Sequence, residues 1–342
     1  MSETIVLTGA TGFIAKHVAV KLLNAGYRVR ATLRSPARAE EVAAAVRPAL
    51  DDPSDLEARL SFLPLDLLRN DGWAEAMKGA QALVHTASPF PMDDPRDEAD
   101  VIRPAVDGTL RALRAAREAG IDRVVLTSSV AAVMHSDRPP GKTAFDEFDW
   151  TDPAHATATP YIRSKTLAER AAWNFVEAQA PDLRLAVLNP GLVFGPPLDA
   201  HYGTSLRLVE RLLRARDPML PRIAFPVVDV RDVAEAHLRA LVRTDAAGGR
   251  FLLADETLWF HEMAEALQRA LPARRLVTRQ APNAIIRVLS LFDRSIRSIL
   301  PSLGRYERVS NAKARESLGL EFTPAREAVV AAGRWLAENG RA

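Results

Sequence analysis

Short apolar runs alternate with longer amphipathic stretches along the first half of the chain. The short runs are Thr4–Thr8, Arg28–Leu33, Leu60–Leu65, Ala82–Thr86 and Arg123–Thr127. Their length and their β-branched residues predict strands, and the stretches between them, such as Gly12–Ala25 and Ala105–Ala119, predict helices. Apolar runs without polar alternation are typical of strands that helices cover on both faces. We therefore predict an α/β fold with a Rossmann-type, doubly wound parallel sheet.

The pattern changes in the second half of the chain. Residues 136–160 are rich in Pro, Asp, Gly and Thr, which predicts a long loop before a helix that begins near Pro160. A further strand, Leu185–Leu188, is followed by the break Asn189-Pro190-Gly191, and the helical patterns beyond Trp259 have no strand between them. The predicted domains are a nucleotide-binding domain over residues 1–190, to which residues 227–255 return, and a smaller, mostly helical substrate lobe over residues 191–342.

Composition and charge narrow the functional classes. Of the 342 residues, 48% are apolar and 26% are charged, and the net charge is +2 with acidic and basic residues mixed along the chain, so nucleic-acid binding is not expected. Cysteine is absent, which excludes disulfides and a cysteine nucleophile, and we expect no metal site. The start lacks a signal-peptide pattern and no run of about 18 apolar residues occurs, so we expect a cytoplasmic protein without a membrane partner. The sequence allows either a monomer or a homodimer.

The first strand runs directly into the glycine turn Gly9-Ala10-Thr11-Gly12 and then into a helix. A dinucleotide-binding site requires this context, because the glycines permit a tight turn and a close approach of the backbone to a pyrophosphate at the helix N-terminus. Small Ala15 allows that helix to pack closely. The glycine spacing is one residue longer than G-x-G-x-x-G and suits short-chain dehydrogenases. A purely structural strand-to-helix turn is the alternative.

The end of the second strand indicates which dinucleotide binds. NAD enzymes usually place a carboxylate about 20 residues beyond the glycines, where it binds the ribose 2′-hydroxyl. Here no acid occurs between the glycine turn and Glu40. Arg34 and Arg38 could form a fork for a 2′-phosphate, although either could instead be a solvated surface residue of an arginine-rich chain. The sequence therefore predicts NADPH/NADP+. Asp66, after the third strand, could accept the adenine amino group or cap a helix.

Tyr161 and Lys165 are spaced i, i+4 on a predicted helix, so their side chains share one face. A phenol with a pKa of about 10 exchanges protons readily at neutral pH only if a nearby ammonium favours the phenolate, which Lys165 could do. The fifth strand ends in Thr127-Ser128-Ser129, which places a hydroxyl at the carboxyl edge of the sheet, where open α/β sheets bind ligands. The strand end alone does not choose between the two serines.

Taken together, these motifs resemble those of the extended short-chain dehydrogenases/reductases, specifically the dihydroflavonol reductase-like and aldehyde (methylglyoxal) reductase-like group. The similarity runs nearly from end to end. The segments that carry it are Gly9–Ala15 (GATGFIA), His85–Phe90 (HTASPF), Val125–Val133 (VLTSSVAAV), Tyr161–Glu169 (YIRSKTLAE), Asn189–Pro196 (NPGLVFGP) and Asp229–Ala234 (DVRDVA).

The resemblance implies hydride transfer from NADPH to a ketone or aldehyde, with Tyr161 as general acid, Ser129 orienting the carbonyl and Lys165 lowering the tyrosine pKa. It favours Ser129 over Ser128. It also implies that the two arginines hold the 2′-phosphate and that the backbone of residues 190–193 holds the carboxamide. The residues expected at the cofactor are Gly9, Thr11, Gly12, Phe13, Ile14, Arg34, Arg38, Asp66, Leu67, Thr86, Ala87, Ser88, Thr127, Tyr161, Lys165, Pro190, Gly191, Leu192 and Val193.

Two departures from the family pattern bear on the substrate. Ala105 stands where many short-chain dehydrogenases carry a catalytic Asn, so a proton relay through that Asn is not expected. Met134 stands where plant dihydroflavonol reductases read flavonoid hydroxyls with an Asn, and the stretch around Tyr161 lacks the cinnamoyl-CoA reductase signature. A hydrophobic or aryl carbonyl compound is therefore the predicted small-molecule substrate. The expected pocket walls, each of which could equally be plain core, are Phe90, Val130, Met134, Phe194, Tyr202 and Phe225.

Three other functions stay open on the sequence. A hydroxysteroid dehydrogenase is close in pattern. Sugar-nucleotide epimerases and dehydratases share the Tyr/Lys pair but retain NAD, and Arg34 without a neighbouring acid argues against them. An NADP-sensing regulator would perform no chemistry, and such proteins typically lose the Tyr/Lys pair that is present here.

Overall fold

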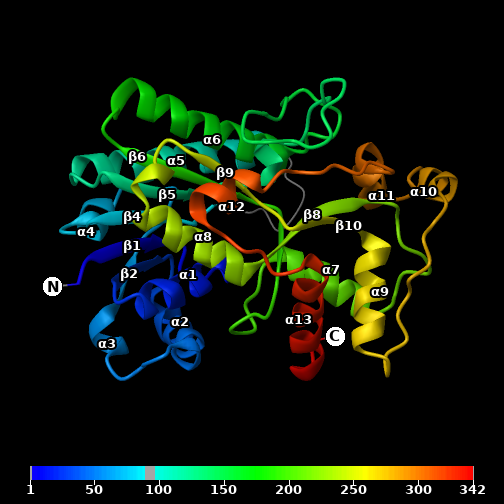
Figure 1. Cartoon of the computed structure of the whole chain (residues 1–342), viewed down its shortest axis with the longest axis horizontal. Helices are drawn as coiled ribbons and strands as arrows, with labels where there is room; N and C mark the ends of the chain where they lie inside the picture. The colour runs from blue at the N-terminus through cyan, green and yellow to red at the C-terminus, as the bar shows by residue number, and fades with distance from the viewer. Residues whose placement is uncertain (1, 89–96, 342) are drawn as a thin grey trace.

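The computed structural model describes residues 2–88 and 97–341, and its elements follow the alternation in the sequence (Figure 1). The strands are β1 (Thr4–Thr8), β2 (Arg28–Leu33), β3 (Leu60–Pro64), β4 (Ala82–His85), β5 (Arg123–Thr127), β6 (Arg184–Pro190), β7 (Leu192–Phe194), β8 (Ala224–Asp229), β9 (Arg250–Leu253) and β10 (Glu256–Trp259). The α-helices are α1 (Phe13–Asn24), α2 (Ala39–Val46), α3 (Leu56–Arg59), α4 (Trp73–Met77), α5 (Ala99–Glu118), α6 (Pro160–Gln179), α7 (Thr204–Leu213), α8 (Val230–Val242), α9 (Phe260–Ala270), α10 (Asn283–Leu289), α11 (Arg294–Ile299), α12 (Ala312–Leu318) and α13 (Ala325–Glu338).

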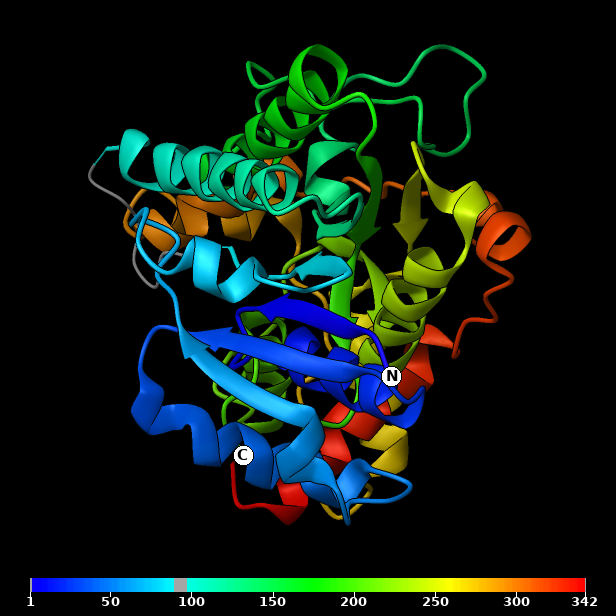
Figure 2. The same ribbon diagram turned by 90° about the vertical axis from the view of Figure 1, so that its left-hand side faces the viewer.

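One seven-stranded sheet, in the order β3-β2-β1-β4-β5-β6-β9, forms the centre of the molecule, and all its strand pairs are parallel. Alternate residues of a strand enter opposite cores: Ile5 and Leu7 pack with α1, whereas Val6 packs with the core that Phe175 of α6 enters. Helices α1, α2 and α8 cover one face, and α4, α5 and α6 cover the other (Figure 2). The predicted doubly wound parallel sheet is confirmed.

The strand order places a binding crevice at the middle of this sheet. The chain adds β2 and β3 on one side of β1 and then crosses over to add β4 on the other side. Open α/β sheets bind ligands beyond the carboxyl ends of the strands at such a crossover point. Thr8 at the end of β1 is in register with His85 at the end of β4, so the glycine turn and the segment after His85 begin side by side.

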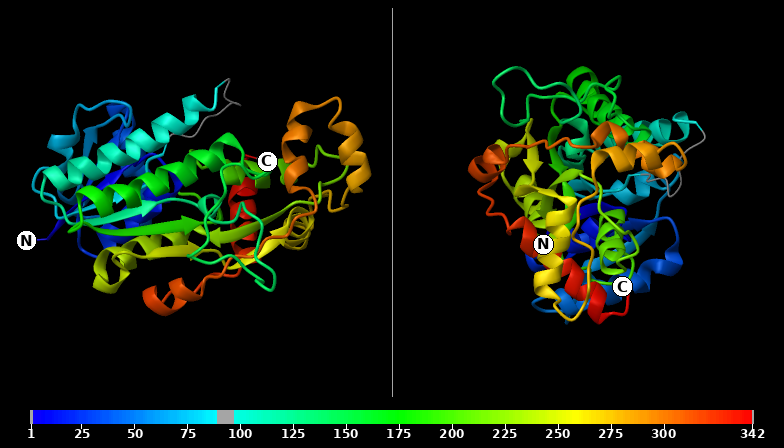
Figure 3. Two further views of the ribbon diagram at one scale, coloured as in Figure 1. Left: turned by 90° about the horizontal axis from the view of Figure 1, so that it is seen from above. Right: turned by 90° about the vertical axis from the view of Figure 1, so that its right-hand side faces the viewer.

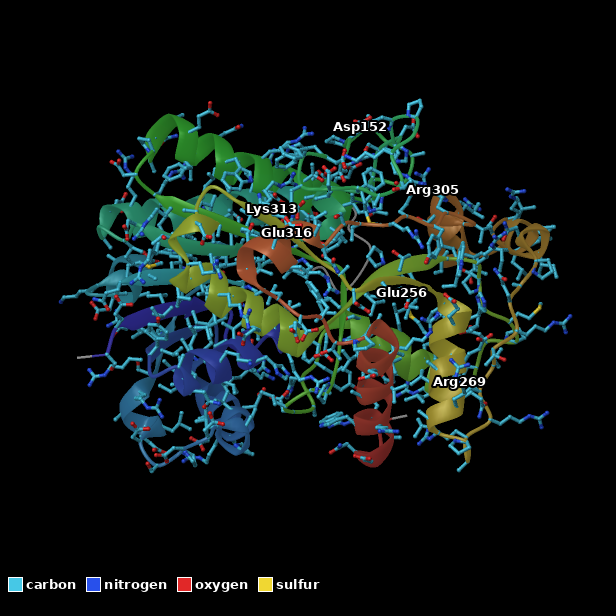
Figure 4. All side chains as sticks on the ribbon, viewed as in Figure 1. Asp152, Glu256, Arg269, Arg305, Lys313 and Glu316 are labelled. Atoms are coloured by element: carbon cyan, nitrogen blue, oxygen red, sulfur yellow. The ribbon has the colours of Figure 1, made fainter. Side chains whose placement is uncertain are left out.

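The C-terminal lobe contains a second sheet of three strands, in the order β10-β8-β7. Helices α7, α9 and α13 pack around it (Figure 3), and Figure 4 labels Glu256 on β10 and Arg269 on α9 in this lobe. We did not predict this sheet, because β7 and β10 have only 3 and 4 residues and pair with a strand far away in the sequence. Helix α8 packs on α1 and β9 pairs with β6, so residues 230–253 contribute to the seven-stranded sheet and its covering helices.

Helix α5 differs from the prediction at its start. It begins at Ala99 rather than at Ala105 and runs through Pro104. A proline cannot donate the backbone hydrogen bond to the carbonyl four residues earlier, which favours a helix start at or after it. That carbonyl belongs to Asp100, which is exposed and can bind water instead. In the part of the chain that the structure describes, no helix is both long enough and apolar enough to cross a bilayer.

Candidate active site

The turn from β1 to α1 has a backbone that only glycine satisfies at one position. Gly9 has φ of 73°, and a Cβ atom there would lie 2.9 Å from the Cα and Cβ atoms of Ala87 beyond β4. The amide of Gly12 donates to the carbonyl of Gly9 at 2.9 Å, and α1 begins directly afterwards at Phe13. Gly12 has no side chain to cap the helix, so the first amides of α1 are available to an anion.

Two cavities meet at this turn and form a continuous cleft over the carboxyl edge of the sheet, with volumes of about 410 and 520 Å³. Both are lined by Gly9, Thr11, Gly12 and Thr86. The first continues past Arg34, Asp66, Leu67, Ala87 and Ser88. The second continues past Phe13, Ile14, Thr127, Ser129, Tyr161, Lys165 and Pro190–Val193. The structure therefore brings all the expected cofactor residues except Arg38 to one elongated cleft.

The two arginines expected at a 2′-phosphate lie apart. Arg34 is exposed at the end of β2 and lines the cleft beside Asp66. Arg38 instead lines an adjoining cavity next to Gly12, and its guanidinium donates to both carboxylate oxygens of Glu41, at 2.9 and 2.6 Å. The predicted fork is thus not formed in this structure, because Glu41 one turn along the chain holds Arg38. Asp66 accepts from the amide of Leu68 at 3.0 Å, within a turn rather than at a helix start.

The catalytic trio is held by the start of α6 and the end of β5. The hydroxyl of Thr159 accepts from the amide of Ile162 at 3.4 Å and so caps α6, with Tyr161 in its first turn. The Tyr161 hydroxyl is hydrogen-bonded to the Ser129 side chain, which also accepts from the amide of Ala131 at 3.1 Å. Lys165 Nζ lies 6.0 Å from the centroid of the Tyr161 ring. Tyr161, Lys165 and Ser129 therefore meet at one end of the cleft.

The neighbouring serine has a different environment. Ser128 is buried and its hydroxyl donates to the carboxylate of Glu169, at 2.5 Å, two turns along α6 from Tyr161. Of the two serines that the sequence left open, the one that contacts the tyrosine is therefore Ser129.

Burial sets the proton affinities of the trio. The pKa of Tyr161 is raised above its ordinary value of 10.0 by burial, which the hydrogen bond from Ser129 only partly offsets. Burial also lowers the pKa of Lys165 to about 8, against the opposing effect of Glu169. Desolvation of the phenol outweighs the Ser129 hydrogen bond in this balance, and the predicted lowering of the tyrosine pKa by Lys165 stays a prediction. At neutral pH Tyr161 carries its proton and Lys165 is mostly cationic.

Two expected cofactor residues use their hydroxyls internally. Thr127 Oγ1 lies 2.7 Å from His237 Nε2, and His237 Nδ1 lies 2.7 Å from the carbonyl of Val233. Because that carbonyl can only accept, Nδ1 carries the proton and Thr127 donates to Nε2. Thr86 donates to the carbonyl of Thr8 at 2.6 Å. Both threonines line the cleft. Thr127 also joins β5 to α8, and Thr86 joins the end of β4 to β1.

His85 lies in the core, as its apolar surroundings in the sequence indicate. It is 2% exposed, its Nδ1 lies 2.8 Å from Thr8 Oγ1, and burial lowers its pKa to about 3. It is therefore a neutral core residue at physiological pH rather than an acid or base.

The expected pocket walls separate into four groups. Tyr202 lines the cleft, and Phe90 lies outside the described residues. Met134 packs against the buried cluster of Phe145 and Leu252, and Val130 and Phe225 are buried or half-buried beside the core. Phe194 is a correction: it is 0% exposed, because β7 points it into the main core, and it forms no wall.

The start of α7 is part of the site and was not predicted from the sequence. Gly203, Thr204, Ser205 and Arg207 line the second cavity, and a Cβ atom at Gly203 would lie 3.8 Å from Cβ of Phe13 at the start of α1. A glycine and two hydroxyl residues directly before an amphipathic stretch predict a helix N-terminus, so a signal was present in the sequence. What the sequence could not provide was the long-range placement of this helix start beside the start of α1.

A buried ion pair fixes the segment that leads to α7. Lys16 on α1 is 2% exposed; its Nζ donates to the Asp199 carboxylate and, at 3.2 Å, to the carbonyl of His201. His201 Nδ1 lies 3.0 Å from Glu41. Asp199, Glu41 and His201 are close enough together to suggest metal ligands, but Lys16 and Arg38 already pair with the two carboxylates. The cluster therefore holds residues 199–203 against α1.

Comparison with known proteins agrees with this geometry. The model of the NAD-dependent epimerase/dehydratase family matches residues 5–254. Cinnamoyl-CoA reductase 1 of Petunia hybrida is 34% identical over 349 residues, covering 99% of this chain and 93% of the relative. Dihydroflavonol 4-reductase of Hordeum vulgare is 34% identical over 277 residues, covering 78% of this chain and 75% of the relative. The structure of yeast methylglyoxal/isovaleraldehyde reductase Gre2 with NADPH matches with a TM-score of 0.80 at 27% identity, covering 99% of this chain and 100% of that one. The resemblance seen in the motifs is confirmed.

Proposed function

The chain belongs to the NAD-dependent epimerase/dehydratase family of extended short-chain dehydrogenases/reductases, and from this we propose that it is an NADPH-dependent carbonyl reductase acting on a ketone or aldehyde. The observation that carries the proposal is the contact between the Tyr161 and Ser129 hydroxyls, with Lys165 one turn away, inside the cleft that the glycine turn also lines. An acid, a second hydroxyl and a cation at one point are what the reduction of a carbonyl requires.

The cleft fits a dinucleotide. Its two cavities meet at Gly9 and Gly12, where the missing side chains leave the backbone open to a pyrophosphate. Arg34 and Asp66 at one end suit the adenosine half with its 2′-phosphate, and Pro190–Val193 beside Lys165 suit the nicotinamide half. When bound, NADPH supplies the hydride that reduces the carbonyl carbon. The yeast relative whose structure contains NADPH supports this choice of cofactor.

The residues of the chain supply the proton and the orientation. The hydroxyls of Ser129 and Tyr161 both donate to the carbonyl oxygen of the substrate, which polarises the carbonyl and fixes its distance from the cofactor face of the cleft. As negative charge develops on that oxygen, Tyr161 transfers its phenolic proton and the alcohol forms. The ammonium of Lys165 stabilises the phenolate that is left. The raised pKa of Tyr161 keeps the acid protonated until this step.

Hydrophobic or aryl carbonyl compounds are the proposed substrates. The cleft beside Tyr161 is lined by Phe13, Ile14, Leu192, Val193 and Tyr202, which provide apolar and aromatic surface. The names of the relatives, which include reductases of cinnamoyl-CoA, dihydroflavonol and isovaleraldehyde, support an acyl, aryl or branched aliphatic carbonyl group.

Absorbance in the nicotinamide band tests the proposal. The purified protein is mixed with NADPH or with NADH and with aryl ketones, keto esters, aryl aldehydes and branched aliphatic aldehydes. We expect consumption of NADPH with at least one class and much slower consumption of NADH. Tight NADPH binding without turnover of any class would instead favour a sensor. Tightly bound NAD, with no consumption of either reduced cofactor and with conversion of an added sugar nucleotide, would favour an epimerase or dehydratase.

A further inference from the structure

A buried carboxylate that the reaction does not use lies behind the catalytic residues. The Glu169 side chain on α6 is 0% exposed. One of its oxygens accepts from Ser128 Oγ at 2.5 Å and from Asn189 Nδ2 at 2.7 Å, and the other accepts from Arg250 Nε at 2.5 Å. Glu169 thereby connects α6 with the ends of β5 and β6 and with β9.

Arg250 extends this cluster to the loop before α6. Its side chain is 8% exposed, and Nη1 donates to the carbonyls of Glu147 and Asp149 at 2.9 and 2.8 Å. Its guanidinium carbon lies 3.7 Å from the centroid of the Trp150 ring. Both oxygens of Glu169 and the Nε and Nη1 atoms of Arg250 are therefore hydrogen-bonded, which a buried ion pair needs in order to be tolerated, while Arg250 Nη2 is buried without a partner among the described residues.

Apart from Arg250, the residues around Glu169 lie one residue or one turn from residues of the proposed reaction. Ser128 precedes Ser129, and Asn189, which also donates to the Ser129 carbonyl at 3.1 Å, precedes Pro190 of the cleft. Glu169 is spaced i, i+4 from Lys165 on the same helix face. The pair with Arg250 also gives Glu169 a structural role, because it ties α6 to β9, so a test of its part in the reaction must separate the two roles.

We propose that Glu169 is a positioning residue for the reductase reaction: its buried carboxylate aligns Ser129 through Ser128 and Asn189, and its negative charge acts on Lys165 one helical turn away. This inference rests on the proposed function, because it assigns Glu169 a role toward the two residues that assist Tyr161. Glu169 itself touches neither the substrate nor the cofactor.

The electrostatic part follows from the groups around Lys165. Tyr161 and Glu169 flank it on α6, His85 faces it from β4 and is neutral, and Arg250 lies beyond Glu169 on β9. Desolvation pushes the pKa of Lys165 down to about 8, and Glu169 opposes this shift. Without the carboxylate a larger fraction of Lys165 is neutral at physiological pH, and a neutral amine cannot stabilise a phenolate.

Direct titration of Lys165 tests the charge role without any turnover. The chain has few lysines, so the 13Cε resonances of a lysine-labelled protein can be followed by NMR against pH, with Lys165 assigned by its loss in Lys165→Arg. We expect the Lys165 midpoint in Glu169→Gln to fall by about 1 pH unit or more, as for loss of an opposite charge at this range. Glu177→Gln, at an exposed position of the same helix, is the matched control and should leave the midpoint in place.

Two further variants separate positioning from folding. Glu169→Gln leaves Arg250 buried without its counter-charge and could unfold the protein, so Glu169→Gln/Arg250→Met removes both charges together. Ser128→Ala removes one hydrogen bond of the cluster and keeps the charges. We expect the double variant to fold, to bind NADPH with unchanged affinity, and to lose at least tenfold in kcat with the alkaline limb of its pH profile moved to lower pH. Ser128→Ala should lose kcat without that pH shift.

A double variant with the wild-type kcat and pH profile, or a Lys165 midpoint that does not move in either Glu169 variant, would overturn the proposal. Failure of the proposed function looks different: the wild-type protein would then reduce no carbonyl compound, while the Lys165 midpoint would still respond to Glu169.

Discussion

Replacing Gly9 by Ala tests the claim that the turn after β1 is shaped by backbone geometry and by contact with β4. The new Cβ would sit on a residue with φ of 73°, which costs about 1–2 kcal/mol for an L-residue. It would also lie 2.9 Å from two atoms of Ala87, and such overpacking costs about 1–3 kcal/mol. We therefore expect Gly9→Ala to lower the free energy of unfolding by about 2–5 kcal/mol.

Gly26→Ala is the matched control for Gly9→Ala. Gly26 follows the other end of α1 and has φ of 84°, and no atom of residues 2–88 and 97–341 lies within 4 Å of the position of a Cβ there. It therefore incurs the conformational cost alone, about 1–2 kcal/mol. The effect of each alanine on the unfolded chain is the same and cancels when the two variants are compared.

Denaturant unfolding and a fluorescence titration with NADPH measure the two consequences. Gly9→Ala should be less stable than Gly26→Ala by about 1–3 kcal/mol, because only Gly9 faces Ala87. Its Kd for NADPH should also rise at least tenfold, since the turn must move into or away from the cleft, whereas Gly26→Ala should bind as the wild type does. Equal stability of the two variants, or an unchanged Kd in Gly9→Ala, would refute the reasoning.

Three other consequences of the structure are open to measurement. Because the pKa of Lys165 is lowered to about 8 and the cation is the active form, kcat should be level below pH 8 and fall about tenfold per pH unit well above it; a profile flat to pH 10 would contradict this. Glu41→Gln should release Arg38 and tighten NADPH binding by about 1.5- to 5-fold, a small gain because the Arg38–Glu41 ion pair is partly exposed. Calorimetry with both cofactors should show no such gain for NADH. Lys16→Met should lower the free energy of unfolding, measured in urea, by roughly 1–3 kcal/mol, which is less than for a fully buried ion pair because Asp199 can reach water. An unchanged free energy of unfolding would mean that the Lys16–Asp199 pair does not hold the segment at residues 199–203.

Much of the fold follows from local patterns in the sequence. β1, β2 and β5 have the predicted bounds, because each is a short apolar run ended by a turn residue or a change of pattern. The Tyr161/Lys165 pair, Ser129 and the glycine turn are each readable because i, i+4 spacing and strand ends are local features. The parallel sheet then follows, since strands separated by helices have few other ways to pair.

What the sequence did not indicate depends on distant contacts. The small sheet pairs β8 with β7 and β10, and its strands are too short to show a period of their own. The burial of Phe194 and the pairing of Arg38 with Glu41 depend on which neighbour each side chain meets after folding. The same holds for Glu169 and Arg250, which look like ordinary charges in the sequence and meet in the core.

The most direct test of the central claim is a single-turnover measurement of hydride transfer in Tyr161→Phe, with the best carbonyl substrate of the wild type. Tyr27→Phe is the control, because Tyr27 lies in the turn between α1 and β2 and lines neither cavity of the cleft. Both variants should bind NADPH as the wild type does. We predict that Tyr161→Phe slows NADPH oxidation by about 100- to 10,000-fold, because the proton donor is lost, while Tyr27→Phe leaves it unchanged. Oxidation of NADPH by Tyr161→Phe at the wild-type rate would contradict the assignment of Tyr161 as the acid and, with it, the proposed mechanism.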